Sequence, residues 1–362
     1  MLLSKIKFLK TLDKIIGNFI ILFIPKTKNQ KTIKKKSIKK ILIIRPGGIG
    51  DFVLLLPTIN YFKKELPHIN IDILCEKRNR EVSGFTENIS SVFLYDKFFD
   101  LIKCINIKYD IIIDTEQWHK LSAIICYLIK SSIKIGYATN NRKKIFTHKI
   151  KYSHEKYEIY SFFDLLSPIL DKKIIFDNNT PFIKINHTLS KNLDSIIQGN
   201  ENKIISIAPG ATIKEKLWDT NNFIKIIKEL TKKNYLIILL GSKNDIIYTN
   251  KIKQKCSVIN LVNKTSLKES SKIIQISKIL ITSDSGLMHI AKALATPTIS
   301  LFGASIEKKW APQGSNHISI NKHIKCSPCT KFGNTPKCKN KIKCLSLIKP
   351  NDVINAINKI LK

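Results

Sequence analysis

Short apolar runs alternate with longer amphipathic segments along most of the chain. Ile41 to Arg45, the run INIDILC and the run YDIIIDTE at 109–116 are continuously apolar at their centres, which is typical of strands buried in a parallel sheet. A helix is predicted from about Phe52 to Leu66, where Pro67 follows. Strand, helix and strand in this order predict an α/β fold with a doubly wound parallel sheet and covering helices.

The same pattern restarts near residue 203. KIISIAPGA, YLIILLGSKND, KILITS and TPTISLFG are predicted strands, and TNNFIKIIKELTKK, KESSKIIQIS and the C-terminal KPNDVINAINKILK are predicted helices. A chain of 362 residues exceeds what one hydrophobic core usually organises. We therefore predict two Rossmann-like doubly wound domains, at 40–190 and 200–362, joined by a polar stretch at about 178–202 and preceded by an extension at 1–39.

The extension combines helical periodicity with lysine. Its apolar residues recur at helical spacing, and lysines fall mainly between them: Leu2, Ile6, Leu9, Leu12, Ile16, Phe19 and Phe23. The unbroken apolar part, 15–25, is about half of the roughly 20 residues that cross a bilayer, and no small-residue cleavage site follows. Two interpretations remain: an amphipathic helix on the inner leaflet, backed by the lysine run, or a helix packed on the body of the protein.

The chain is strongly basic, with 62 Lys and Arg against 27 Asp and Glu and a formal net charge of +35. Such a charge attracts polyanions in general. The basic residues are almost all lysine, however, and they are scattered along the chain. Ile and Asn are also abundant, and this composition is expected from an AT-rich genome. Readers of nucleic acid favour arginine and aromatic platforms, and none is visible. We therefore expect no nucleic-acid partner, and salt-dependent binding of oligonucleotides would contradict this.

Four of the eight cysteines are clustered near the C-terminus in CSPCTKFGNTPKCKNKIKC. The cluster contains a C-x2-C pair and two later thiols, at Cys326, Cys329, Cys338 and Cys344. Four thiolates could hold a structural zinc ion in tetrahedral geometry. Zinc sites more often have a C-x2-C pair at both ends, so reduced thiols or a local disulfide remain alternatives.

A glycine-rich turn, RPGGIGD, follows the first predicted strand. Gly47, Gly48 and Gly50 allow the backbone to approach a ligand closely, and free amides at the start of a helix attract anions. The spacing matches neither the dinucleotide fingerprint nor the phosphate-binding P-loop. Asp51 stands at the predicted helix start, as an N-cap or as a general base, and the spacing alone favours the cap.

Two loops of the second domain carry further polar residues. APGATIKEKLW places Thr212 and Lys216 in a loop after a strand, where a lysine beside a hydroxyl and free amides suits a diphosphate. The strand KILITS then delivers Asp284, Ser285 and Gly286 to a helix start that favours phosphate. The aspartate would repel phosphate, so we expect it to face sugar hydroxyls. His289, one turn inside the helix, is on spacing alone more readily a core histidine than a phosphate ligand.

These motifs, in this order, resemble glycosyltransferase family 9, the ADP-heptose:lipopolysaccharide heptosyltransferases. The resemblance runs from about Lys40 to the C-terminus and rests on four segments: ILIIRPGGIGDFVLLLPTINYFKKELP; ISIAPGATIKEKLWDTNNFIKII; DSGLMHIAKALATPTISLFG followed by WAPQG; and CSPC with two later cysteines before a closing helix. The block D-S-G-x-x-H followed by L-F-G is the most specific.

The resemblance implies a GT-B fold, with an N-terminal acceptor domain and a C-terminal nucleotide-sugar domain facing each other across a cleft. It also implies inverting transfer that requires no cofactor. Asp51 matches the catalytic base, which reverses the preference for a mere cap. The remaining matches are to donor-binding positions: Lys216 at the phosphates, Thr212 as a neighbouring donor contact, Asp284 at the sugar, Ser285 and Gly286 at the diphosphate, and His289 at the same site.

The implied donor is ADP-heptose, and the implied acceptor is an anionic glycolipid, the lipid A and Kdo inner core or a heptosylated core. Such an enzyme is expected in the cytoplasm, peripherally associated with the inner membrane. Three alternatives remain open: a protein acceptor, another nucleotide sugar, and a non-catalytic scaffold that binds the donor alone. The extension, the cysteine cluster and much of the segment 75–200 are not accounted for by the family chemistry.

Overall fold

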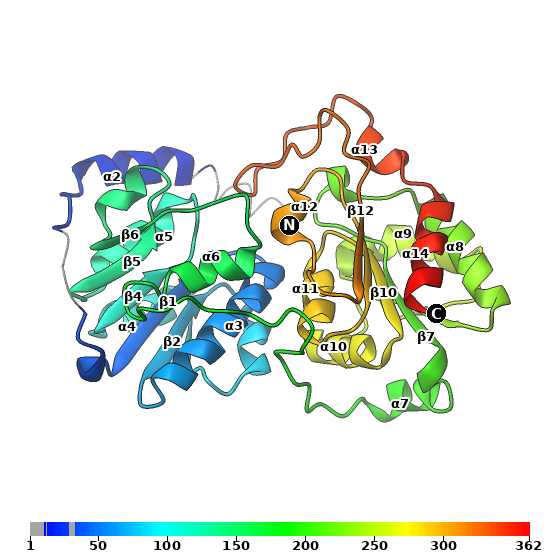
Figure 1. The fold of residues 1–362 in the computed structure, drawn as a ribbon, viewed down its shortest axis with the longest axis horizontal. Coiled ribbons are helices and arrows are strands. Elements are labelled where there is room, and N and C mark those ends of the chain that lie inside the picture. The colour runs from blue at the N-terminus through cyan, green and yellow to red at the C-terminus, as the bar shows by residue number, and fades with distance from the viewer. Residues whose placement is uncertain (1–10, 12, 29–32) are drawn as a thin grey trace. The chain divides into compact units, whose positions relative to one another are not determined.

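The computed structural model describes residue 11 and residues 13–28 and 33–362, and divides them between two compact units, Met1–Ile175 and Phe176–Lys362. Each unit contains its own six-stranded sheet with helices on its faces (Figure 1). The predicted helical positions Leu2, Ile6, Leu9 and Leu12 lie outside the described residues. Within the described ranges, no helix has both the length and the apolar character needed to cross a bilayer.

The sheet of the N-terminal unit has the strand order β3-β2-β1-β4-β5-β6, and every pairing is parallel. Its strands are β1 (Lys40–Arg45), β2 (Asn70–Cys75), β3 (Ser91–Leu94), β4 (Ile111–Asp114), β5 (Ile133–Tyr137) and β6 (His148–Ile150). β1 and β4 are buried almost throughout, as expected of strands with helices on both faces. This order is that of the Rossmann fold, so the doubly wound prediction is confirmed.

Helices cover both faces of this sheet. α3 (Ile49–Glu65) connects β1 to β2 and packs against α6 (Glu158–Asp164). On the opposite face, α4 (Phe98–Ile105) and α5 (Lys120–Leu128) share one apolar cluster with Leu42 and Ile44 of β1. Because parallel strands require right-handed crossovers, helices that connect strands in opposite directions along the sheet fall on opposite faces.

The N-terminal segment packs on this second face. A π-helical turn, η1 (Asp13–Gly17), leads into α2 (Asn18–Phe23), which lies beside α5 (Figure 1). Asp13 Oδ1 accepts hydrogen bonds from the backbone amides of Lys120 (2.6 Å) and Leu121 (2.7 Å) at the start of α5. Ile21 and Ile24 are buried in the same cluster. For the described residues, the interpretation of a helix packed on the body is therefore confirmed.

The C-terminal unit repeats the architecture. Its sheet has the order β12-β11-β10-β7-β8-β9, again parallel throughout, which read from the other edge is the same Rossmann order. Its strands are β7 (Ile204–Ala208), β8 (Leu236–Leu239), β9 (Ile259–Asn260), β10 (Ile279–Ser283), β11 (Thr298–Leu301) and β12 (His317–Ile320).

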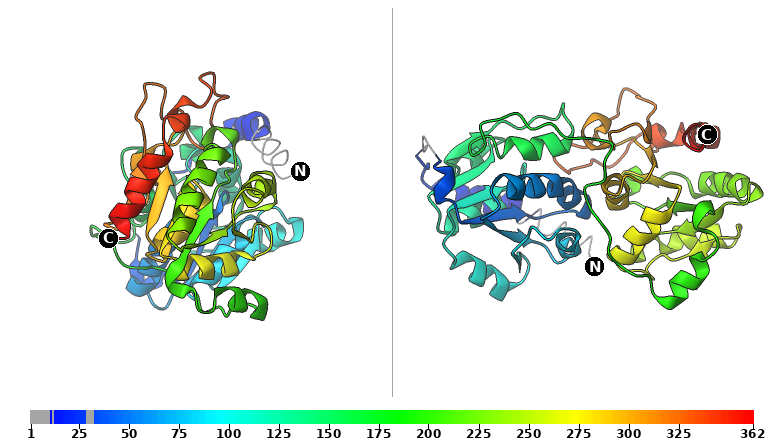
Figure 2. Two further views of the ribbon diagram at one scale, coloured as in Figure 1. Left: turned by 90° about the vertical axis from the view of Figure 1, so that its right-hand side faces the viewer. Right: turned by 60° about the horizontal axis from the view of Figure 1, so that its bottom comes forward.

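The helices of this unit are α7 (Lys191–Ile197), α8 (Thr220–Lys232), α9 (Ile246–Lys253), α10 (Leu267–Ile276), α11 (Gly286–Ala293), α12 (Glu307–Trp310), α13 (Lys343–Ser346) and α14 (Pro350–Ile360). The C-terminal α14 packs against α8 (Figure 2). Part of the polar stretch at 178–202 also belongs to this unit, because the Phe182 amide donates to the Ala293 carbonyl and Lys292 Nζ bonds to the Asn178 carbonyl.

Candidate functional site

The polar loops of the C-terminal unit meet at one edge of its sheet. β7 and β10 are adjacent and parallel, so the loops that follow Ala208 and Ser283 leave the sheet at the same edge. Ligands of such sheets bind at the carboxyl ends of the strands. Lys216 Nζ, from the first loop, lies 2.6 Å from Asp284 Oδ2, from the second. Two residues that are far apart in the chain thus form one polar site.

The position of Lys216 is fixed by the aromatic residue that follows it. Lys216 ends a short 3-10 turn, η6 (Lys214–Lys216). Two residues later, Trp218 is buried, with its Nε1 donating to the Ile348 carbonyl (3.0 Å) and its ring edge-on to Phe223. This anchor explains why a lysine on a loop can keep a defined position. Thr212 lies exposed earlier in the same loop.

Asp284 precedes the N-terminus of α11. Ser285 is the N-cap of this helix, and its Oγ accepts from the Met288 amide (3.4 Å) and lies 3.0 Å from Thr282 Oγ1. Gly286 is the first helical residue. The positive end of the helix dipole therefore lies beside Asp284 and Lys216, at a place suited to an anionic ligand.

The electrostatics keep Asp284 ionised. Burial raises the pKa of this carboxyl. The charge of Lys216, the nearby His289 and the hydrogen bond from Lys216 together lower it by more, so the pKa lies below the ordinary value. His289 is only 4% exposed, and its ring packs edge-on against Trp310. The histidine is thus a buried residue of the unit and also an electrostatic neighbour of the site.

The backbone after β7 approaches a carboxylate that the sequence analysis did not single out. A Cβ placed on Gly210 would lie 1.9 Å from Asp245 Oδ1, so no side chain fits there. Asp245 Oδ2 accepts from the amide (2.7 Å) and Oγ (2.9 Å) of Ser242 in the loop after β8. Ser242 and Asp245 form a capping box, and the Ser-x-x-Asp spacing in GSKND is the sequence signal that could have identified it.

In the N-terminal unit, the glycine-rich loop follows β1 as predicted, but the helix starts earlier than expected. Its N-cap is Gly48, and Asp51 is the third residue of α3, so the N-cap interpretation of Asp51 is wrong. Gly50 is buried within the first turn. Gly47 has φ of 113°, which favours glycine, and its amide donates to Glu76 Oε1 (3.0 Å). Asp51 therefore does not satisfy a cap and stays available for another role.

A buried ionic group lies beside this loop, and the sequence analysis missed it. Arg45, the last residue of β1, is 2% exposed, with Nη2 3.4 Å from Glu116 Oε2 and Nη1 donating to the Thr115 carbonyl. Burial lowers the pKa of Arg45, but the negative charges of Asp51 and Glu116 outweigh it and leave the pKa raised. A lone arginine at a strand end gives little sequence signal, because its partners, Thr115 and Glu116, come from the loop after β4, about seventy residues later.

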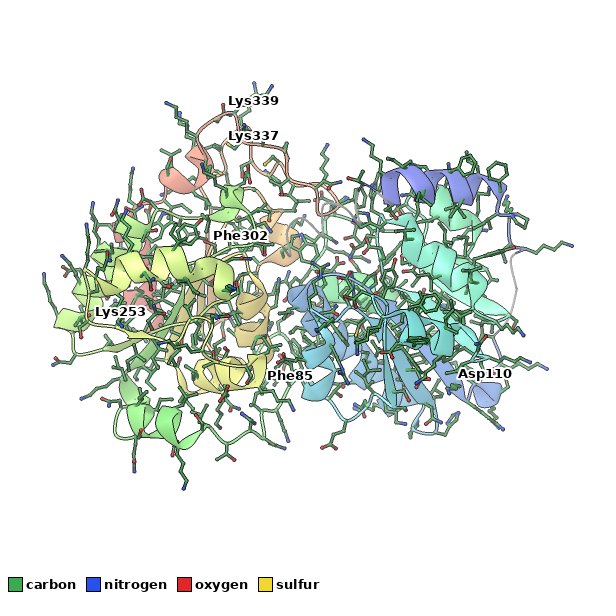
Figure 3. All side chains as sticks on the ribbon, turned by 180° about the vertical axis from the view of Figure 1, so that it is seen from behind. Phe85, Asp110, Lys253, Phe302, Lys337 and Lys339 are labelled. Atoms are coloured by element: carbon green, nitrogen blue, oxygen red, sulfur yellow. The ribbon has the colours of Figure 1, made fainter. Side chains whose placement is uncertain are left out.

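Three of the clustered cysteines, Cys326, Cys329 and Cys338, lie in a loop that projects from the C-terminal unit, where Lys337 and Lys339 are also found (Figure 3), and Cys344 lies in α13. All eight cysteines are free thiols. Cys344 packs against Gly303, and Cys338 Sγ accepts from the Ile342 amide. The thiols are close enough to raise the pKa of Cys329 and Cys344, although burial is the larger cause. Among the described residues, however, no three His, Cys, Asp or Glu side chains are arranged to hold a metal ion. The structural zinc stays a prediction from spacing.

Comparison with known proteins identifies the family to which the chain belongs. The family model described as "Glycosyltransferase family 9 (heptosyltransferase)" matches residues 99–340. The chain belongs to glycosyltransferase family 9. The matched region includes the Lys216 and Asp284 loops and begins after Asp51, so the donor-side residues lie inside it and the glycine-rich loop outside it. As a member of this family, the protein is a glycosyltransferase.

Individual relatives agree with the family. Lipopolysaccharide heptosyltransferase 3 of Escherichia coli is 28% identical over 295 residues, which cover 75% of this chain and 85% of that protein. A family 9 glycosyltransferase from Veillonella parvula has a similar fold, with a TM-score of 0.71 at 18% identity over 89% of this chain and 97% of that one. The E. coli heptosyltransferase WaaC, solved with ADP-2-deoxy-2-fluoro heptose, superposes with a TM-score of 0.67 at 16% identity, covering 88% and 99%. These structures show the shared two-domain fold.

Proposed function

We propose that this glycosyltransferase transfers a heptose from ADP-heptose to the inner core of lipopolysaccharide, on lipid A–Kdo or on an already heptosylated core, with inversion at the anomeric carbon. The observation that carries the proposal is the contact between Lys216 and Asp284 at the N-terminal end of α11. It places a cation, a helix dipole and a carboxylate together, which a sugar diphosphate requires. The names of the relatives supply the donor and the acceptor.

The donor would occupy this edge of the C-terminal unit. Lys216 and the α11 amides at Ser285 and Gly286 would bind the diphosphate, Asp284 would accept from sugar hydroxyls, and Thr212 and His289 would complete the site. Lys216 pairs with Asp284 in the structure, so an incoming phosphate competes with the carboxylate for the ammonium group. Stabilisation of the departing ADP by Lys216 and the helix dipole would need no metal ion or other cofactor.

The acceptor would be activated from the N-terminal unit. Asp51 would accept the proton of an acceptor hydroxyl, whose oxygen attacks the anomeric carbon from the face opposite ADP. Asp51 suits this role because it does not cap α3, and Gly48 presents no side chain next to its carboxylate, where a Cβ would lie 2.9 Å from Oδ2.

The acceptor that we propose is an anionic glycolipid, so we place the enzyme in the cytoplasm, peripherally on the inner face of the cytoplasmic membrane. A polybasic chain is attracted to such a surface. The alternatives of a protein acceptor, of another nucleotide sugar, or of a scaffold that binds the donor without turnover are separated by the experiment below.

The test is release of ADP by the purified protein, with ADP-heptose as donor and Kdo-lipid A, heptosylated core or acceptor protein offered separately. We expect ADP and a heptosylated glycolipid only when a glycolipid acceptor is present. Release with a protein acceptor alone, or with a different nucleotide sugar alone, would replace the proposed substrates. Donor binding without turnover on any acceptor would identify a scaffold instead.

A further inference from the structure

Large exposed apolar side chains gather on one helical layer of the N-terminal unit. The described residues contain fourteen of them, and eleven lie on the layer formed by η1, α2, α4 and α5: Ile15, Ile16, Phe19, Ile20, Leu22, Phe23, Phe98, Phe99, Ile102, Tyr127 and Leu128. Six of the eleven lie within nine residues of η1 and α2. Scattered apolar residues on a surface need no explanation, but such a concentration marks a surface that contacts something apolar.

The segment that carries these residues is firmly attached to the unit. Asp13 caps α5, Ile21 and Ile24 are buried, and Lys144 Nζ donates to the Ile21 and Leu22 carbonyls on the inner side. The outer side of α2 nevertheless presents Phe19 at 63% and Phe23 at 74% exposure, with their rings in edge-to-face contact. The helix is thus apolar on both sides, and packing on the unit buries only one of them.

The exposed charges of the described residues 13–28 are of a single sign. Lys14, Lys26 and Lys28 are exposed at the two ends of this outer side. Asp13, the one acid of the segment 13–50, is buried and engaged with the α5 amides. Aromatic and aliphatic side chains flanked by lysines without acids suit the interface of an anionic bilayer, where rings enter the acyl boundary and ammonium groups meet headgroup phosphates.

We infer that the outer side of η1 and α2, with Phe19 and Phe23 at its centre, docks the N-terminal unit on an anionic lipid bilayer. The proposal rests on the proposed function in that a membrane-embedded acceptor gives such docking its purpose. It goes further, because it names the surface and its occupant. The unit that carries Asp51 would thereby lie on the membrane that holds the acceptor, without any membrane-spanning helix among the described residues.

The experiment measures cosedimentation of the full chain with phosphatidylcholine vesicles, with or without phosphatidylglycerol, in the absence of donor and acceptor. We expect binding to the anionic vesicles that weakens as salt screens the lysines. The variant Phe19→Ser/Phe23→Ser should bind at least about tenfold more weakly, since two rings no longer leave water. Ile175→Ser/Ile247→Ser is the matched control: both side chains are also strongly exposed, at 88% and 72%, but lie outside the layer, so binding should be unchanged.

A second variant tests the charges without touching the apolar side. Lys26→Gln/Lys28→Gln should lower binding to anionic vesicles by roughly fivefold per lysine and leave binding to neutral vesicles unchanged. Unaltered circular dichroism and unfolding temperature would show that each variant folds.

Three results would overturn the inference: wild-type protein that binds neither vesicle, Phe19→Ser/Phe23→Ser that binds like wild type, or a change in oligomeric state by sedimentation velocity as the only effect of that variant. The last would assign the surface to a second copy of the chain. Because the vesicles contain no sugar acceptor, these results do not depend on ADP release.

Discussion

Lys216 Nζ and Asp284 Oδ2 lie 2.6 Å apart, although 68 positions separate the two residues in the chain. Both side chains are largely buried, with 22% and 11% exposure. The pair joins the loops after two adjacent strands, β7 and β10. A cation and an anion held this way, at the start of α11, form a defined polar site of the C-terminal unit.

Lys216→Met should weaken ADP binding at least about tenfold, measured by isothermal titration calorimetry, since it removes the cation proposed to meet the phosphates. It should also lower the free energy of unfolding by about 2 kcal/mol, because the Asp284 carboxylate is left without its counter-charge. The double variant Lys216→Met/Asp284→Leu should regain most of the stability without regaining ADP binding. Equal losses of stability in the single and double variants would contradict this coupling.

Asp51→Asn should reduce turnover by a factor of about 10² to 10⁴, the contribution of a general base, and leave ADP affinity unchanged. Asparagine keeps the size of the side chain but cannot accept the proton. The matched control is Glu65→Gln at the other end of α3, where the carboxylate pairs with Lys172. The control should keep its turnover. Retained turnover in Asp51→Asn would remove the residue from the mechanism.

Gly48→Ala should separate stability from activity. Its backbone is extended and acceptable to alanine, but the added methyl would lie 2.9 Å from Asp51 Oδ2, and the flexible carboxylate would have to move. We expect an unfolding free energy within about 0.5 kcal/mol of wild type, as for a substitution that displaces only a side-chain end. Turnover should fall by an order of magnitude or more, since a displaced base loses alignment. Unchanged turnover with unchanged stability would show that the position of Asp51 is not critical.

The contribution of Asp13 to the stability of the N-terminal unit should decrease as the pH falls. Burial raises the pKa of this carboxyl, but hydrogen bonds from His119 and the amide of Leu121 outweigh it, and the pKa lies below its ordinary value. Since the folded pKa is lower than that of the unfolded chain, the stabilisation is complete above the unfolded pKa of about 3.9 and disappears as pH falls through the folded pKa. Asp13→Asn should thus lower the stability of the N-terminal unit by about 1 kcal/mol near neutral pH.

Thermal unfolding at a series of pH values checks this. The difference between wild type and Asp13→Asn should be constant from neutral pH to about pH 5 and should narrow at lower pH. A difference that grows as the pH falls would have the wrong sign for a depressed carboxyl pKa.

Variants of two of the clustered cysteines can distinguish a packing role from zinc binding. Cys344 is buried against Gly303, whereas Cys326 is exposed. If packing is what matters, Cys344→Ser should lower the free energy of unfolding by about 1 to 2 kcal/mol, and Cys326→Ser should leave it unchanged. If all four thiols hold zinc, both variants should lose metal and stability together. Metal analysis of the purified wild-type protein completes the comparison.

Several short strands of the segment 75–200 could not be predicted from the sequence. β3, β5 and β6 contain five residues or fewer, and β5 includes Lys134 and Gly136, so none forms a distinct apolar run. Lys134 is buried there because its Nζ donates to the Tyr127 carbonyl at the end of α5. Propensity cannot anticipate such a partner, since it comes from another element of the fold.

The sequence by itself determined the two doubly wound sheets, the loops that carry the polar residues and the family resemblance, because strand and helix periodicity and turn residues are local properties of the chain. Tertiary structure alone decided that Lys216 contacts Asp284, that Gly48 and not Asp51 caps α3, and that Asp13 fastens the N-terminal segment to α5. Each of these depends on which strands are neighbours and where each helix begins. That arrangement is set by the packing of the whole core, to which every local pattern contributes only a part.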